Sequence, residues 1–197
     1  METDFSYIDE NYRKIIYNIK EAAAKYRKPD EKIALMAVTK TVDPAAVNHA
    51  IGLGIDLLGE NRVQEYLSKK EFYRKEAEVH FIGHLQTNKV KYIIDSVSMI
   101  QSVDSIKLAE EIDRHAKRIG KKQDILIEVN IGGEDSKSGI EKGRLQELIY
   151  QVSELENVKV RGLMAIPPAD SPEKFLHDMQ ELYIDISHKS IHNISMD

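Results

Sequence analysis

The chain has 197 residues, no cysteine and a formal net charge of −5. The absence of cysteine excludes disulfides, cysteine-ligated zinc, iron–sulfur clusters and thiol nucleophiles. The mild acidity argues against nucleic acid as a partner, because proteins that bind a polyanion usually present a basic face. With 42% hydrophobic and 31% charged residues, the composition is that of an ordinary globular protein.

No segment of the sequence has the character of a membrane span or of a signal peptide. The longest uninterrupted apolar run covers residues 33–38, whereas a spanning helix needs roughly 20 residues. The first four residues are acidic in character and lack the basic start of a signal peptide. We therefore expect a cytoplasmic protein without a membrane partner.

Short apolar runs alternate with amphipathic segments along the chain. A charged segment predicts a helix over about residues 7–28, which Pro29 ends. Six strand-like runs follow, at residues 33–40, 55–60, 79–83, 97–103, 125–131 and 158–166. A weaker candidate for a seventh strand begins near Ile191. This alternation is typical of βαβ units with a mainly parallel sheet.

Several turns carry the signals that begin or end helices. Asp43-Pro44 and Ser171-Pro172 each place an N-cap before a first-turn proline. Residues 61–64 can form a capping box, in which the asparagine bonds the Gln64 amide and the glutamine reaches back. Gly52 and Gly120 stand where the glycines that end helices belong.

No linker or low-complexity tract divides the sequence, so we expect a single domain over residues 1–197. The fold class is α/β, either as an open doubly wound sheet or as a closed (β/α)8 barrel. Dinucleotide-binding folds have a glycine-rich turn after the first strand, and residues 39–43 contain no glycine. That difference favours the barrel.

Lys40 ends the first predicted strand, on the same face as Met36 and Val38. In a barrel the chemistry takes place at the carboxyl ends of the strands. Desolvation beside apolar side chains disfavours the charged ammonium and would leave the amine partly neutral. A neutral amine attacks aldehydes, so Lys40 is a candidate for a Schiff base. The alternative is a strand-end lysine that extends into water.

Two further strand ends carry polar side chains. Asn61, besides its role as a helix cap, lies where it could meet an oxygen of a bound ring. His80 and His84 are four residues apart, but across a strand this spacing amounts to roughly 13 Å, too far for one zinc ion. We expect a structural His80, an available His84 and no metal site. Three later histidines are expected at the surface: His177, His188 and His192.

The fifth and sixth strands end differently. Residues 128–130, Glu-Val-Asn, precede a polar loop that contains glycines. The acidic side chains of this loop make it a poor site for binding phosphate. Residues 162–164, Gly-Leu-Met, precede a rigid turn with two prolines. The sequence contains no serine–histidine triad, P-loop or metalloprotease motif.

Four segments, taken in order, resemble a known family. They are residues 37–40 (Ala-Val-Thr-Lys), 59–65 (Gly-Glu-Asn-Arg-Val-Gln-Glu), 82–89 (Ile-Gly-His-Leu-Gln-Thr-Asn-Lys) and 162–164. The resemblance is to the pyridoxal phosphate homeostasis protein family, the single-domain relatives of the N-terminal barrel of alanine racemase. It extends over nearly the whole chain.

The resemblance implies a (β/α)8 barrel that binds pyridoxal 5′-phosphate as an aldimine on Lys40, with Asn61, His84 and Met164 as further cofactor-binding residues. It implies a monomer that carries or regulates the cofactor pool, serves pyridoxal-phosphate-dependent apoenzymes and is not a conventional enzyme. A racemase of this type needs a second acid or base from an additional domain, for which 197 residues leave no room.

The C-terminal end departs from the family pattern. Family members continue with a seventh strand rich in serine and methionine and an eighth with arginine and glycines, which hold the phosphate. This chain stops at Ser195-Met196-Asp197. We therefore expect a truncated barrel that lacks its last strand or strands, with a weakened phosphate site and exposed sheet edges that lower stability or promote association.

Two alternatives stay open. One is a small pyridoxal-phosphate-dependent enzyme, either an amino-acid racemase or a Schiff-base aldolase, although an aldolase usually carries its lysine on a later strand. The other is a fragment with a decayed phosphate site that serves in structure or interaction. A borohydride-fixed label on Lys40 separates the fragment from the others, and turnover assays with amino acids separate carrier from enzyme.

Overall fold

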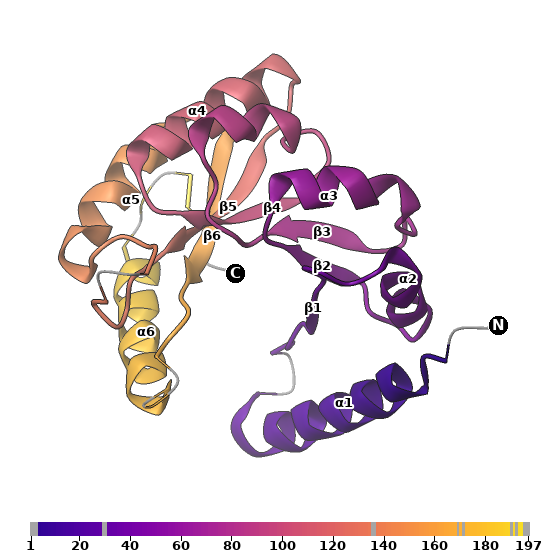
Figure 1. Cartoon of the computed structure of the whole chain (residues 1–197). Coiled ribbons are helices and arrows are strands. Elements are labelled where there is room, and N and C mark those ends of the chain that lie inside the picture. Colours follow the sequence, from indigo (N-terminus) through magenta and orange to yellow (C-terminus); the bar gives the residue numbers. More distant parts are fainter. Residues whose placement is uncertain are drawn as a thin grey trace. The chain divides into compact units, whose positions relative to one another are not determined.

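The computed structural model describes residues 4–28, 31–134, 137–168, 170, 172–189, 191 and 193–194. Helices and strands alternate through them (Figure 1). The strands are β1 (Met36–Val38), β2 (Leu57–Glu60), β3 (Glu78–Phe81), β4 (Met99–Val103), β5 (Gln123–Glu128) and β6 (Val158–Met164). The α-helices are α1 (Ser6–Tyr26), α2 (Pro44–Gly52), α3 (Val63–Lys69), α4 (Ile106–Arg118), α5 (Leu145–Ser153) and α6 (Pro172–Ser187). Short 3-10 helices are η1 (Lys70–Phe72), η2 (Thr87–Tyr92) and η3 (Lys142–Arg144).

The chain forms two compact units, whose boundary falls within β3. The first unit comprises Met1–Glu60 and Gln64–Val79, and the second comprises Asn61–Val63 and His80–Asp197. In each unit the neighbouring strands of the sheet are also neighbours in the chain and run parallel. The alternation predicted from the sequence is therefore confirmed.

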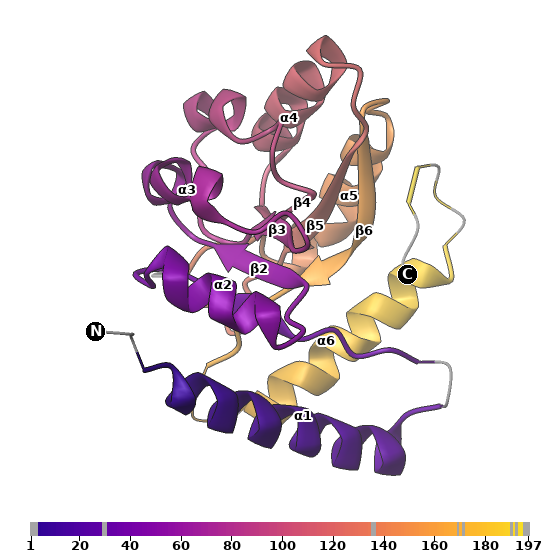
Figure 2. The same ribbon diagram turned by 90° about the vertical axis from the view of Figure 1, so that its right-hand side faces the viewer.

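In the first unit β1 pairs with β2, so that Met36 lies opposite Leu57. The helix α2 begins as predicted, because the Asp43 carboxylate accepts the N–H of Ala45 at 2.8 Å and Pro44 occupies the first turn. The long helix α1 packs against α2 (Figure 2). The buried apolar side chains of this unit include Val47, Ile51, Leu58 and Tyr66.

The helix α1 confirms the predicted charged helix and spans 21 residues. It ends where Arg27 takes an extended backbone, before Pro29, which lies outside the described residues. None of its residues is buried. Among the described residues, no helix combines the length and the apolar character that crossing a membrane requires.

Both predicted helix ends are confirmed, since α2 ends at Gly52 and Gly120 follows α4, although Gly52 itself is not left-handed. Gly52 is still part of α2, because the chain continues with helical backbone through Leu53, and the left-handed glycine is Gly54 at φ 110°. Gly120, at φ 64°, follows α4 as predicted. The predicted cap at Ser171 lies outside the described residues, although α6 does begin at Pro172.

In the second unit β3, β4, β5 and β6 stand in chain order. His80 lies opposite Met99, and Ile125 lies opposite both Ile100 and Val160. The helices α4 and α5 pack against each other and against β6 (Figure 1). The side chains that are fully buried here include Phe81, Ile93, Ile100, Ile112, Ile125, Ile127 and Ile149.

The end of the described chain lies beside β6. Ile194 forms an isolated parallel bridge with Val160, so residues near the predicted seventh strand do add to the sheet next to β6. Residues 195–197 lie outside the described residues. The first strand is shorter than predicted, because Ile33 and Ala34 are exposed and Lys40 lies in a turn.

Replacing Asp43 by alanine should lower the free energy of unfolding by about 1 kcal/mol, because the first-turn N–H of α2 loses its acceptor. Asp43→Asn keeps a capping oxygen and should stay within a few tenths of a kcal/mol of the wild type. Urea unfolding of the three proteins measures the difference. Equal losses in both variants would contradict the capping role.

Candidate functional site

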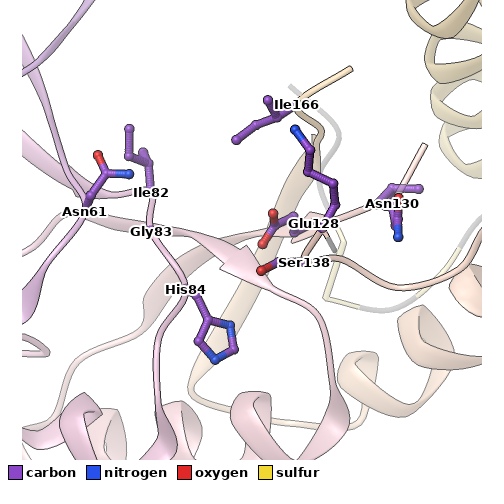
Figure 3. Close-up of a pocket in the computed structure, with 10 residues that line it drawn as sticks. Asn61, Ile82, Gly83, His84, Glu128, Asn130, Ser138 and Ile166 are labelled. Carbon is purple, nitrogen blue, oxygen red and sulfur yellow. The ribbon is translucent and has the colours of Figure 1, made fainter. Parts of the chain in front are cut away.

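A pocket of about 220 Å³ opens at the carboxyl ends of strands in the second unit (Figure 3). Asn61 follows β2, His84 follows β3, and Glu128 is the last residue of β5. Parallel barrels hold their ligands at this end of the strands. The lining residues are Asn61, Ile82, Gly83, His84, Glu128, Val129, Asn130, Lys137, Ser138 and Ile166.

Asn61 does not cap α3. Its Oδ1 is buried and has no hydrogen-bond partner, so the predicted bond to the Gln64 amide is absent. The side chain instead lines the pocket (Figure 3). An unpaired buried amide oxygen costs about 1–3 kcal/mol, which a ligand donor would offset. The capping prediction is therefore wrong, and the alternative role of Asn61 in meeting a ligand gains support.

Gly83 brings two strand ends into close contact. A Cβ atom at this position would lie 2.2 Å from the Asn61 carbonyl oxygen and 2.7 Å from its Cα. No side chain fits there, because both contacts are with main chain that cannot rotate away. Glycine at position 83 thus allows its main chain to lie close to that of Asn61 in the pocket wall.

The two histidines of this segment have different surroundings, as predicted. His84 is exposed and lines the pocket. His80 is buried on β3, and its Nδ1 accepts a hydrogen bond of 2.8 Å from the Gln101 side-chain amide. The structural role expected for His80 is confirmed.

Glu128 lines the pocket, and its pKa departs from the ordinary value of a glutamate. Its side chain is 7% exposed. Burial, with a smaller contribution from the carboxylate of Asp104, raises the pKa of Glu128 to about 7. The pocket therefore contains a carboxyl group that can donate a proton near neutral pH.

Glu128 lies near the end of a predicted strand but is not among the site residues predicted from the sequence. A signal was available, because this acid interrupts the apolar run of residues 125–131 at the end of a strand. Met164, which was placed in the site, is half-buried at the end of β6 and lies opposite Glu128 in the sheet. It is not among the pocket-lining residues, whereas Ile166 is. A ligand role for Met164 stays a prediction.

Lys40 belongs to the first unit and is exposed in the turn after β1. The desolvation expected from the strand pattern is thus not seen at its side chain, because β1 ends two residues earlier. Its backbone is held on both sides. The Thr39 carbonyl accepts from Lys69 Nζ at 2.9 Å, and the Thr41 N–H donates to Glu65 Oε1 at 2.5 Å.

A buried carboxylate lies next to this turn. Glu60 is 0% exposed, and its Oε1 accepts from Thr39 Oγ1 at 2.8 Å and from Tyr73 Oη at 2.5 Å. Lys69 Nζ lies 4.0 Å from the same oxygen, while Oε2 has no partner. Burial and the bond to Glu60 raise the pKa of Tyr73, so its hydroxyl remains a donor.

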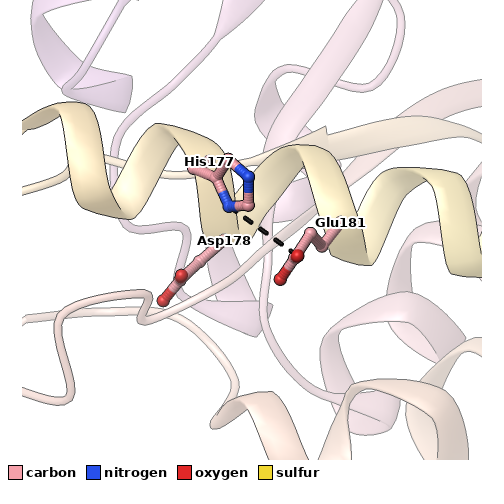
Figure 4. Close-up of side chains that lie close together, drawn as sticks. All are labelled: His177, Asp178 and Glu181. Atoms are coloured by element: carbon pink, nitrogen blue, oxygen red, sulfur yellow. Dashed lines mark ion pairs between the residues drawn. The ribbon is translucent and has the colours of Figure 1, made fainter.

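A second group of polar side chains lies on α6 (Figure 4). His177 Nδ1 is 3.8 Å from Glu181 Oε1, and both side chains are more than two-thirds exposed. Asp178 pairs with Lys142 at 2.6 Å, and this hydrogen bond lowers the pKa of Asp178. These are ordinary surface ion pairs. The predicted surface position of His177 is confirmed.

The chain matches the family described as "Alanine racemase, N-terminal domain" over residues 11–192. It is 43% identical over 166 residues to a protein of Aquifex aeolicus (strain VF5) named pyridoxal phosphate homeostasis protein. The aligned segment covers 83% of this chain and 73% of the relative.

Two solved structures are similar in fold and in sequence. A protein from Bifidobacterium adolescentis, described as unknown, superposes with a TM-score of 0.90 at 28% identity, over 96% of this chain and 82% of that one. PipY of Synechococcus elongatus PCC7942, described with PLP bound, gives a TM-score of 0.72 at 27% identity, over 85% and 79% of the two chains.

Gly83→Ala should destabilise the protein by about 2–3 kcal/mol, because the added methyl group meets main chain that must move. The matched control is Gly143→Ala, where a Cβ atom meets nothing within 4 Å. Urea unfolding of both variants checks the expectation. A Gly83→Ala protein as stable as the control would show that the contact with Asn61 is not tight.

The raised pKa of Glu128 makes stability depend on pH. The folded protein holds this proton up to about pH 7, whereas the unfolded chain releases it near pH 4.5, so the stabilisation is fully present below 4.5 and is lost as pH rises through 7. Glu128→Gln removes this loss. Relative to wild type, the variant should gain up to about 3 kcal/mol between pH 4 and pH 8. Unfolding curves with a constant difference across this range would contradict the shift.

Proposed function

The chain belongs to the alanine racemase N-terminal domain family, among the pyridoxal phosphate homeostasis proteins, and from that premise we propose that it binds pyridoxal 5′-phosphate and keeps it available to other proteins. The barrel predicted as the fold class is confirmed with the family. The observation that carries the ligand proposal is the strand-end pocket, in which Asn61 Oδ1 is buried without a partner.

The pocket residues suit a substituted pyridine ring. Ile82 and Ile166 offer apolar surface for its faces, while Asn61 and His84 offer an amide and an imidazole for its polar substituents. Glu128, with a pKa of about 7, can donate or accept a proton there. The 27% identical PipY, described with PLP bound, supports this assignment. The proposed binding residues are Lys40, Asn61, His84 and Met164.

Pyridoxal phosphate supplies an aldehyde when it is bound. Lys40 would hold the cofactor through its side-chain amine, whose condensation with the aldehyde would release one water and replace the C=O bond by a C=N bond without any change of oxidation state. Water would reverse this condensation, and a second amine would displace Lys40 from the cofactor. The exposure of Lys40 suits such an exchange, because an amine of another protein can reach it.

We propose a carrier and not an enzyme. The curated relatives are named for homeostasis of the cofactor, and racemisation needs a second acid or base opposite the first. In this proposal the protein is a cytoplasmic monomer, a single domain over residues 1–197, that delivers the cofactor to apoenzymes. The second candidate function is amino-acid racemisation, which the likeness to the N-terminal barrel of alanine racemase favours.

Incubation with pyridoxal phosphate, followed by borohydride reduction and peptide mapping, should place the label on Lys40, because that amine carries the cofactor in this proposal. Lys40→Arg keeps the charge but cannot form the linkage, so it should lose the label and the yellow absorbance. Lys14→Arg on α1, an exposed lysine outside the site, is the matched control and should keep both.

A label distributed over exposed lysines, unchanged in Lys40→Arg, would overturn the proposed linkage. Turnover distinguishes the two candidate functions. A carrier should convert L-amino acids no faster than Lys40→Arg does, whereas racemisation that Lys40→Arg abolishes would establish the enzyme instead.

A further inference from the structure

An ion pair on α3 holds both peptide groups that flank Lys40. Lys69 Nζ donates to the carbonyl of Thr39, which belongs to the peptide bond before Lys40. Glu65 Oε1 accepts the N–H of Thr41, which belongs to the peptide bond after it. Glu65 and Lys69 are themselves paired at 2.6 Å, one helical turn apart. The two partners of one ion pair therefore hydrogen-bond to the main chain on both sides of Lys40.

The main chain of this turn is strained at Thr41. Thr41 lies in the left-handed region at φ 61°, which is rare for a residue branched at Cβ. Such conformations persist where the surroundings over-determine them, and they gather at functional sites. Here the Thr41 N–H is taken by Glu65, and the Thr41 hydroxyl donates to the Lys40 carbonyl at 2.7 Å.

The ion pair is itself held against the interior. The side chains of Lys69 and Glu65 are only 11% and 18% exposed. Thr39, which receives the bond from Lys69, is anchored by its hydroxyl to the buried Glu60 carboxylate. This ion pair is therefore less exposed than a surface pair, and each of its side chains also bonds the main chain.

We propose that Glu65 and Lys69 are positioning residues for Lys40, fixing its backbone so that the amine meets the aldehyde of the cofactor from one direction. The inference rests on the proposed function, since Lys40 must be the lysine that reacts. An amine must approach a carbonyl carbon from a defined direction. A fixed backbone limits the positions that the flexible Lys40 side chain samples, so its amine reaches that geometry more often. Lys69 is not a competing nucleophile, because its amine is occupied by Glu65 and by the Thr39 carbonyl.

The test compares Glu65→Ala, Glu65→Gln and Lys69→Met by titration with pyridoxal phosphate, borohydride reduction and mapping of the label. Loss of a hydrogen bond to a charged group corresponds to roughly 10- to 100-fold in affinity, so Glu65→Ala and Lys69→Met should lose cofactor affinity by that factor. Glu65→Gln keeps an oxygen for the Thr41 N–H and should retain most of the affinity. Amide exchange of Thr41 should accelerate at least about tenfold in Glu65→Ala only.

The control pair is Glu71→Ala and Lys75→Met, an exposed glutamate and lysine with the same spacing, which should leave labelling unchanged. Reductive methylation with formaldehyde provides a second control. This small aldehyde reaches a flexible amine from any side, so the rate at Lys40 should stay constant in all variants. A general loss of structure would instead appear as a lower melting temperature of the variant.

Thr41→Gly separates positioning from stability. Glycine adopts the left-handed conformation freely, so the variant should melt at the same or a higher temperature. Its looser turn should still lower the cofactor affinity of Lys40. Loss of labelling together with a lower melting temperature would count against positioning.

The two proposals fail in different ways. If the wild type takes no label at Lys40, the proposed function is wrong and the positioning role falls with it. If the wild type is labelled at Lys40 but Glu65→Ala and Lys69→Met are labelled equally well, the positioning role is wrong and the proposed function stands.

Discussion

The Glu60 carboxylate at the end of β2 is fully buried, and the polar interior of the first unit is arranged around it. A buried polar group without partners costs free energy, so donors must reach it. Thr39 and Tyr73 do so directly, and Lys69 lies 4.0 Å away. The strand β1 has three residues and none of them is buried. Polar contacts hold its end, and they include the bond of Thr39 to this carboxylate and bonds of the same residue to Gly59 and Lys69.

That dependence has a chemical use. A turn held by hydrogen bonds can present an exposed lysine. The first unit thus presents an exposed lysine on a hydrogen-bonded turn, whereas the second unit provides a pocket with an amide, an imidazole and a carboxyl group of near-neutral pKa.

Much of the fold could be predicted from the sequence, because strands and helices leave periodic patterns and Asp43-Pro44 is a local signal. The order of the elements and the position of α1 followed from such patterns. Predictions from local sequence signals failed where contacts with other parts of the chain compete with the local structure. Asn61 has the sequence of a helix cap, but its side chain lines a pocket instead. Gly52 does end α2, but the left-handed glycine is Gly54, two residues later.

The site was predicted in part, for the same reason. Motif resemblance pointed to Lys40, Asn61 and His84, which lie at strand ends. It gave no indication that Glu65 bonds the amide of Thr41, because 24 residues separate them and no spacing rule relates them. The titration of Glu128 likewise depends on burial by distant segments.

The close approach of Gly83 to Asn61 has a consequence for how this pocket can diversify. Part of its wall is main chain in van der Waals contact with main chain, so that part keeps its shape whatever side chains are exchanged around it. Selection for another ligand can then act on the amide, the imidazole and the carboxyl group one at a time, without rebuilding the scaffold. A glycine that contributes no chemistry of its own thereby separates the evolution of specificity from the evolution of the fold.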